Sequence, residues 1–175
     1  SSSAHEFRKT SRREGMEDAC VSGGLLESRA DGIRAIAGGG HGFGDWWDRH
    51  HEAHPEVFAL QPDGTRSGFP NPRNAKLCMS NPKVWELWLE DVAAELKQDP
   101  NRTVFNAAPN DGWASGHCVC ANCTAWDHPD GEPRVFNWFK RNEQRPATSD
   151  RDVNFANKLG ELLKRKYPGR DYRVL

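Results

Sequence analysis

Apolar residues recur at the spacing of an α-helix in two segments of the chain. In the first segment, Ser80 or Asn81 is placed to cap the helix, Pro82 lies in its first turn, and Pro100 sets its far limit. The spacing predicts one buried face, formed by Val84, Trp85, Trp88, Leu89, Val92 and Leu96. We therefore expect a helix that begins near Pro82 and ends before Pro100.

The second helical segment lies near the end of the sequence. Ser149 or Asp150 is a suitable cap, and the sequence Tyr167-Pro168-Gly169 predicts where the helix ends. Its expected inward side chains are Phe155, Leu159, Leu162 and Leu163. Both helices should therefore pack one apolar face against the same core.

Short apolar runs predict strands around these helices, at Ile33–Ala37, Val57–Leu60, Thr103–Ala108 and Tyr172–Leu175. The alternation of strand, helix, strand, helix and strand is typical of an α/β protein with a parallel sheet. Helices must cover both faces of a parallel sheet, and the two crossover helices predicted here would cover only part of them. We therefore expect a partial (β/α) barrel with a small parallel sheet, completed by self-association as a homodimer. A small three-layer sandwich is the alternative.

Composition and charge narrow the class of protein. The chain has 175 residues, 36% of them apolar and 28% charged, which is typical of a folded globular protein. Its net charge of −1 gives no basis for a nucleic-acid or membrane partner. No run of 18 apolar residues occurs, and Ser1–Arg13 lacks the apolar stretch of a signal peptide. Residues 1–33 show no clear periodicity, so we expect a divergent or poorly ordered segment before a domain over residues 34–175.

Cysteine spacing gives the strongest chemical prediction. Cys118, Cys120 and Cys123 form a C-x-C-x-x-C sequence in a long loop expected over residues 110–150. Three thiolates so close together can surround one ion, whereas a disulfide framework spreads its cysteines more evenly. Thiolates select zinc or iron–sulfur centres, and no further cysteine follows at ferredoxin spacing, so we expect Zn²⁺. The reduced thiolates also favour a cytoplasmic location.

The fourth zinc ligand is left open by the sequence. Cys78 precedes a predicted helix and lies near a strand end, which places it at the same edge of a parallel sheet as the cluster. His128, and then His117, are the local alternatives. Four protein ligands would make a closed, structural site, whereas three ligands and a water would make an open site that activates a nucleophile.

Two polar residues follow predicted strands and are candidates for catalysis. His41 comes after the first apolar run, and Asp111 comes after Thr103–Ala108, beside Asn110. The carboxyl ends of parallel strands are where βα proteins place proton-transfer groups. We therefore expect His41 and Asp111 to be catalytic and Asn110 to bind substrate. A hydrogen-bonded structural histidine and a loop-capping aspartate are the alternatives.

Two histidines and three tryptophans are weaker candidates for binding a metal or a substrate. His50 and His54 are four residues apart and could bind a second metal, although Pro55 limits the helix and a solvated face is the stronger interpretation. Three of the seven tryptophans, Trp46, Trp47 and Trp113, lie beside polar groups in expected loops. Such indoles can stack on sugar rings, so we expect them to bind substrate.

An ordered series of motifs extends over most of the chain. The motifs are Gly39-Gly40-His41, His54-Pro55-Glu56-Val57-Phe58-Ala59-Leu60, Leu77-Cys78-Met79-Ser80-Asn81-Pro82, Asn110-Asp111-Gly112-Trp113 with the three clustered cysteines, and Tyr167-Pro168. Together they resemble an uncharacterised bacterial domain family related to α-glucuronidase-like (β/α)8-barrel glycoside hydrolases, over about residues 36–175. The resemblance implies carbohydrate-linked hydrolysis and a barrel rim built from His41, Cys78, Asn110, Asp111 and the cysteine loop. A full barrel has eight strands, so this chain corresponds to a truncated fragment. Glycosidases use two carboxylates, of which only Asp111 is a good candidate.

These observations predict a zinc-dependent hydrolase of broad substrate range. Metal-activated water would act on an ester, phosphoester or glycoside, and Asp111 or His41 would move the proton. The expected partner is a small-molecule or carbohydrate substrate. The alternatives are a non-catalytic carbohydrate-binding domain and a zinc-stabilised interaction module.

Overall fold

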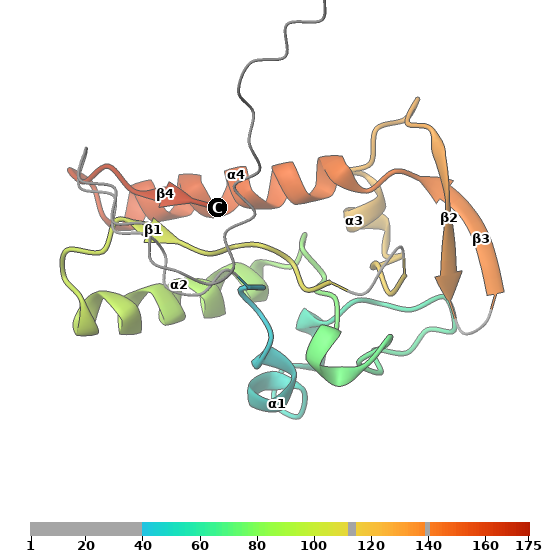
Figure 1. Ribbon diagram of the computed structural model, residues 1–175, viewed down its shortest axis with the longest axis horizontal. Coiled ribbons are helices and arrows are strands. Elements are labelled where there is room, and N and C mark those ends of the chain that lie inside the picture. The colour runs from blue at the N-terminus through green and yellow to red at the C-terminus, as the bar shows by residue number, and fades with distance from the viewer. Residues whose placement is uncertain (1–39, 112–114, 139–140) are drawn as a thin grey trace, which may run out of the picture. The chain divides into compact units, whose positions relative to one another are not determined.

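A computed structural model of the protein describes residues 40–111, 115–138 and 141–175, which belong to one compact unit beginning at Ile36. The predicted strand at Ile33–Ala37, the N-terminal segment and Trp113 lie outside the described residues. The helices are α1 (Trp46–His50), α2 (Pro82–Gln98), α3 (Ala121–Thr124) and α4 (Ser149–Lys166), with short 3-10 helices at Pro55–Val57 and Pro72–Asn74. The strands are β1 (Val104–Phe105), β2 (Pro133–Trp138), β3 (Arg141–Pro146) and β4 (Arg173–Val174) (Figure 1).

The fold is α/β, with two small sheets in the described chain. β1 and β4 pair in parallel, with Val104 opposite Arg173 and Phe105 opposite Val174. β2 and β3 form an antiparallel hairpin. The parallel pair confirms the prediction that the strands before and after the last helix run in the same direction, as crossover connections require.

The two predicted long helices are confirmed. The Asn81 side chain caps α2 by accepting a hydrogen bond from the Lys83 amide at 2.9 Å, and Pro82 occupies the first turn. The buried residues of α2 are Val84, Leu87, Trp88 and Val92, and those of α4 are Arg151, Phe155, Leu159 and Leu163. The cap of α4 is Thr148 and not Ser149 or Asp150, because both of these residues already lie within the helix.

The core lies between α2, α4 and the parallel strands (Figure 1), and Trp46 of α1 belongs to the same apolar cluster. Trp88 of α2 packs edge-on against Phe105 of β1, and its indole N–H donates to the Asn106 carbonyl at 3.0 Å. This packing holds Asn106, the residue after β1, against α2. The predicted strand at Val57–Leu60 is not regular: Pro55 begins a 3-10 helix, and Phe58 forms an isolated antiparallel bridge with Leu77.

The predicted long loop over residues 110–150 contains regular structure. It includes α3 and the β2–β3 hairpin, which pairs from Pro133 opposite Pro146 to Trp138 opposite Arg141. The hairpin was missed because its strands are largely polar and begin and end at proline. In the part of the chain that the structure describes, no helix is both long and apolar enough to cross a membrane.

Candidate metal centre

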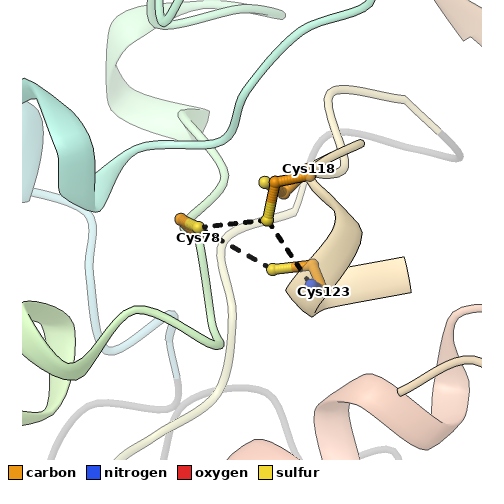
Figure 2. Close-up of side chains that lie close together, drawn as sticks. Cys78, Cys118 and Cys123 are labelled. Carbon is orange, nitrogen blue, oxygen red and sulfur yellow. Dashed lines mark hydrogen bonds between the residues drawn. The ribbon is translucent and has the colours of Figure 1, made fainter. Parts of the chain in front are cut away.

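Four cysteine side chains from two distant parts of the chain converge at one point. Figure 2 shows three of them, Cys78, Cys118 and Cys123. Cys78 follows the bridge residue Leu77 and precedes α2, and its amide donates to the Val57 carbonyl at 2.8 Å. Cys118 lies in the segment before α3, Cys120 caps that helix, and Cys123 is within it. The two segments are held side by side by a hydrogen bond from the Val119 amide to the Leu60 carbonyl at 2.9 Å.

The spacing of the sulfur atoms fits a tetrahedral metal site. All four Sγ atoms lie within 4.8 Å of one another, and Cys78 Sγ is 3.6 Å from Cys120 Sγ and 3.8 Å from Cys123 Sγ. With a zinc–sulfur bond of about 2.3 Å, ideal tetrahedral geometry separates two sulfurs by about 3.8 Å. The four thiolates therefore surround a space of the size that one zinc ion needs.

Backbone amides and a hydroxyl donate hydrogen bonds to these sulfurs. The Leu60 amide lies 3.3 Å from Cys118 Sγ, and the Cys123 amide lies 3.4 Å from Cys120 Sγ. Ser80 Oγ is 3.1 Å from Cys123 Sγ. Donors directed at sulfur stabilise the ionised thiolate and orient it, as outer-shell groups do around bound metals.

Burial makes the cluster unfavourable without a cation. Cys78, Cys118 and Cys123 are buried. The hydrogen bond from Cys118 lowers the pKa of Cys78, but the hydrogen bond with Cys123, burial and the neighbouring sulfurs outweigh it and raise that pKa to about 12. Hydrogen bonds with Cys123 and Cys78 together with burial likewise raise the pKa of Cys118. Four thiolates at neutral pH therefore require a divalent ion to balance their charge.

A buried arginine connects the cluster to α4. Arg151, in the first turn of α4, donates from Nη1 to the Cys118 carbonyl at 2.6 Å. Its guanidinium also pairs in two places with Asp127, which follows α3, with Nη2 and Oδ2 2.6 Å apart. Both side chains are more than nine-tenths buried. Arg151 was not predicted from the sequence, although it lies four residues before Phe155 on the inward face of the helix.

Gly116 allows the chain to approach the core just before the cluster. Its φ is +75°, and a Cβ at this position would lie 2.9 Å from the Phe69 carbonyl oxygen and 2.9 Å from Pro70 Cδ. The buried amide of Gln61 donates to the Gly116 carbonyl at 3.2 Å. Gly116 therefore sets the position from which Cys118 enters the cluster.

We predict that Gly116→Ala destabilises the protein and weakens metal binding. The left-handed backbone costs about 1–3 kcal/mol for a residue with a side chain, and the overlap adds about 1–3 kcal/mol. Gly64→Ala is the matched control, since Gly64 has a φ of +84° with nothing within 4 Å of the new Cβ. Denaturant unfolding should show a larger loss of unfolding free energy for Gly116→Ala than for Gly64→Ala. Equal losses would contradict the close approach of the Gly116 backbone to Phe69 and Pro70.

The structure brings His41 and Asp111 together at the surface. His41 Nδ1 lies 2.6 Å from the Pro109 carbonyl oxygen, and His41 Nε2 lies 3.2 Å from Asp111 Oδ2. Both ring nitrogens therefore face oxygen acceptors. The Asp111 side chain is 86% exposed, so its carboxylate is open to solvent.

The contacts of Asn110 and Trp46 indicate that both side chains stabilise the fold. The buried Asn110 amide donates to the Phe43 and Ala75 carbonyls, both at 3.0 Å, and so ties two loops together. Trp46 is 0% exposed, and its indole N–H donates to Asp91 at 3.1 Å. The prediction that Trp46 stacks on a sugar is therefore wrong, because its ring faces are covered by the core.

Trp47 is half-buried and already has aromatic partners. Its ring stacks on His51 at 4.9 Å and meets Phe58 edge-on at 4.8 Å. Gly68 lies against the indole so closely that a Cβ there would be 2.9 Å from the ring. These contacts give Trp47 a packing role at the edge of the core.

The remaining histidine candidates lie outside the cysteine cluster. His128 is exposed and accepts a hydrogen bond from the Asp130 amide, while His117 packs edge-on against Phe136. The rings of His50 and His54 are 6.4 Å apart. Within residues 40–111, 115–138 and 141–175, the four cysteines are the only set of three or more histidine, cysteine or acidic side chains grouped closely enough to hold a metal.

Comparison with known proteins identifies one related family. Residues 4–175 match the family described as "Domain of unknown function (DUF4838)". The match begins well before residue 34, so it includes most of the N-terminal segment that was expected to diverge. Neither the curated proteins nor the solved structures include a significant match.

Proposed function

The chain belongs to the DUF4838 family of domains of unknown function, and we propose that it binds one zinc ion in a closed site whose role is structural. The ligands are Cys78, Cys118, Cys120 and Cys123. The observation that carries this proposal is the convergence of four sulfur atoms within 4.8 Å. The ion would join the segment before α2 to the segment around α3.

Saturation of the metal by sulfur argues against metal-activated water. A zinc ion that polarises water keeps one position open, whereas four thiolates fill the tetrahedral shell. Three of the four cysteines are buried, which also limits access of a substrate to the ion. The zinc-stabilised domain is therefore better supported than the zinc-dependent hydrolase that the sequence suggested.

Substitution of cobalt(II) for zinc tests whether the site is closed. We expect one cobalt per chain, with the absorption of a tetrahedral ion bound by four thiolates. Azide should leave that spectrum unchanged, because no coordination position is free. A spectrum that shifts in a saturable way with azide would show an exchangeable ligand and would restore the metal-activated mechanism.

A second candidate function rests on the pair formed by His41 and Asp111. A histidine oriented by a backbone carbonyl, with an exposed carboxylate 3.2 Å away, can transfer protons to and from a bound substrate. The pair supports hydrolysis of esters, phosphoesters or glycosides in which the zinc ion has no chemical role. The carbohydrate link remains a proposal that rests on sequence resemblance.

We predict that His41→Ala and Asp111→Asn reduce any hydrolysis of activated esters, phosphate esters or aryl glycosides by about 10²–10⁴-fold, the usual contribution of a general acid or base. Zinc content and unfolding free energy should change little, because the pair is exposed. His54→Ala is the control, since His54 makes a similar exposed pair with Glu56 at 3.3 Å. Turnover that is equal in the wild type and both variants would exclude the pair from catalysis.

A further inference from the structure

A cavity of about 430 Å³ lies between the β2–β3 hairpin and the first turn of α4, and no cysteine of the cluster lines it. Its lining includes Lys76, Arg134, Thr148, Ser149 and Asp152. His117, Ala147 and two apolar side chains of the hairpin, Val135 and Phe136, complete the wall. Cavities that combine apolar walls with a few convergent polar groups are the usual form of small-molecule sites.

Lys76 is a buried cation with one hydrogen-bond acceptor among the described residues. It is 7% exposed, and its ammonium donates to the Asn110 carbonyl. An ammonium has three N–H donors, so within the part of the chain that the structure describes two of them remain for other acceptors. Burial lowers the pKa of Lys76, while the charges of Asp152 and Asp111 act against that effect. An anion in the cavity would supply the missing acceptors and relieve the cost of the buried charge.

Two further groups on the cavity wall favour an anion. Arg134 is exposed, and its guanidinium offers a planar set of donors that suits carboxylate and phosphate oxygens. The Thr148 carbonyl accepts a hydrogen bond from the Arg151 amide at 3.0 Å. The Thr148 side chain does not cap α4, however, so the first two amides of this 18-residue helix have no side-chain cap from that residue. Two cations face one carboxyl, that of Asp152, so the cavity has an excess of positive charge.

We propose that this cavity binds a small molecule through an anionic oxygen group, a carboxylate or a phosphate, held by Lys76, Arg134 and the first turn of α4. The phenyl ring of Phe136 and the side chain of Val135 would contact the apolar part of that molecule. Lys76 also contacts the carbonyl of Asn110, the residue before Asp111. The proposal does not depend on the role of the zinc ion.

Titration calorimetry on the full chain, with its zinc content measured, tests this proposal. Inorganic phosphate, acetate and methylammonium are the three probes, each at constant ionic strength. We expect saturable binding of phosphate or acetate, and the preferred probe identifies the anionic group. Lys76→Met and Arg134→Gln should each weaken binding by about tenfold, as loss of a charged hydrogen bond does. Asp152→Asn should strengthen it, because the competing carboxyl is removed.

The control is Arg165→Gln, which removes a cation from the exposed last turn of α4, far along the helix from the cavity. This variant should bind the anion as the wild type does. Because Arg134 is exposed, Arg134→Gln tests the site even if Lys76→Met fails to fold. Absence of anion binding to the zinc-loaded wild type, a preference for methylammonium, or equal losses in Arg134→Gln and Arg165→Gln would overturn the proposal.

Discussion

The Cys78→Ser variant is expected to lose its zinc ion and most of its resistance to unfolding. Apparent binding free energies of structural zinc reach about 10–16 kcal/mol at neutral pH, and this energy is also folding energy. A domain of this size is typically stable by about 5–15 kcal/mol, so loss of the ion removes a large part of the total. Cys78 joins the segment before α2 to the segment around α3, and no other ligand comes from the first of these.

Metal analysis and thermal melting measure this effect directly. Treatment of the wild type with a chelator should lower its melting temperature as the variant does, and added zinc should reverse the change only in the wild type. His128→Ala is the control, because His128 is exposed and, within the described residues, lies outside the cluster. Unchanged melting after verified removal of the metal would contradict a structural role for the ion.

Replacing Arg151 with methionine is expected to produce the second large loss of stability. The substitution leaves the Asp127 carboxylate buried without its partner and the Cys118 carbonyl without its donor. Breaking a buried ion pair on one side costs about 3–5 kcal/mol. Because the Cys118 carbonyl belongs to a metal ligand, the variant should also bind zinc more weakly, by about 10–100-fold.

Denaturant unfolding with a surface control tests this prediction. Lys83→Met removes one partner of the exposed pair with Glu86 on α2 and should cost less than about 1 kcal/mol. The double variant Arg151→Met with Asp127→Leu should regain part of the loss, because no charge then remains buried. Equal losses for Arg151→Met and Lys83→Met would show that the buried pair contributes no more than a surface pair.

The predictable parts of the fold are those in which a local pattern agrees with the final packing. Asn81 and Pro82 define the start of α2, and the apolar spacing after them is regular, so the helix could be found from the sequence alone. Cys78 could be placed with the distant cysteines from its residue type and its position between an extended segment and a helix, although that segment pairs antiparallel, through the bridge of Leu77 with Phe58, and not in the parallel sheet that the prediction assumed.

The parts that were missed depend on contacts between distant residues. Trp46 lies in a five-residue helix among polar neighbours, so only tertiary packing reveals that it is buried. Arg151 belongs to a residue type that is usually exposed, and its burial depends on Asp127, which is 24 residues away in sequence. Apolar and polar residues alternate only weakly in the β2–β3 hairpin. Its pairing depends on contacts along both full strands, which a local sequence pattern does not show.

X-ray absorption at the zinc edge of the purified, reduced protein tests the central claim most directly. A closed site predicts four sulfur scatterers at about 2.3 Å around one zinc ion per chain. Three sulfurs with one nitrogen or oxygen at about 2.0–2.1 Å would contradict the account, since the ion would then carry a histidine or a water. Protein that contains no metal at all would contradict it more completely.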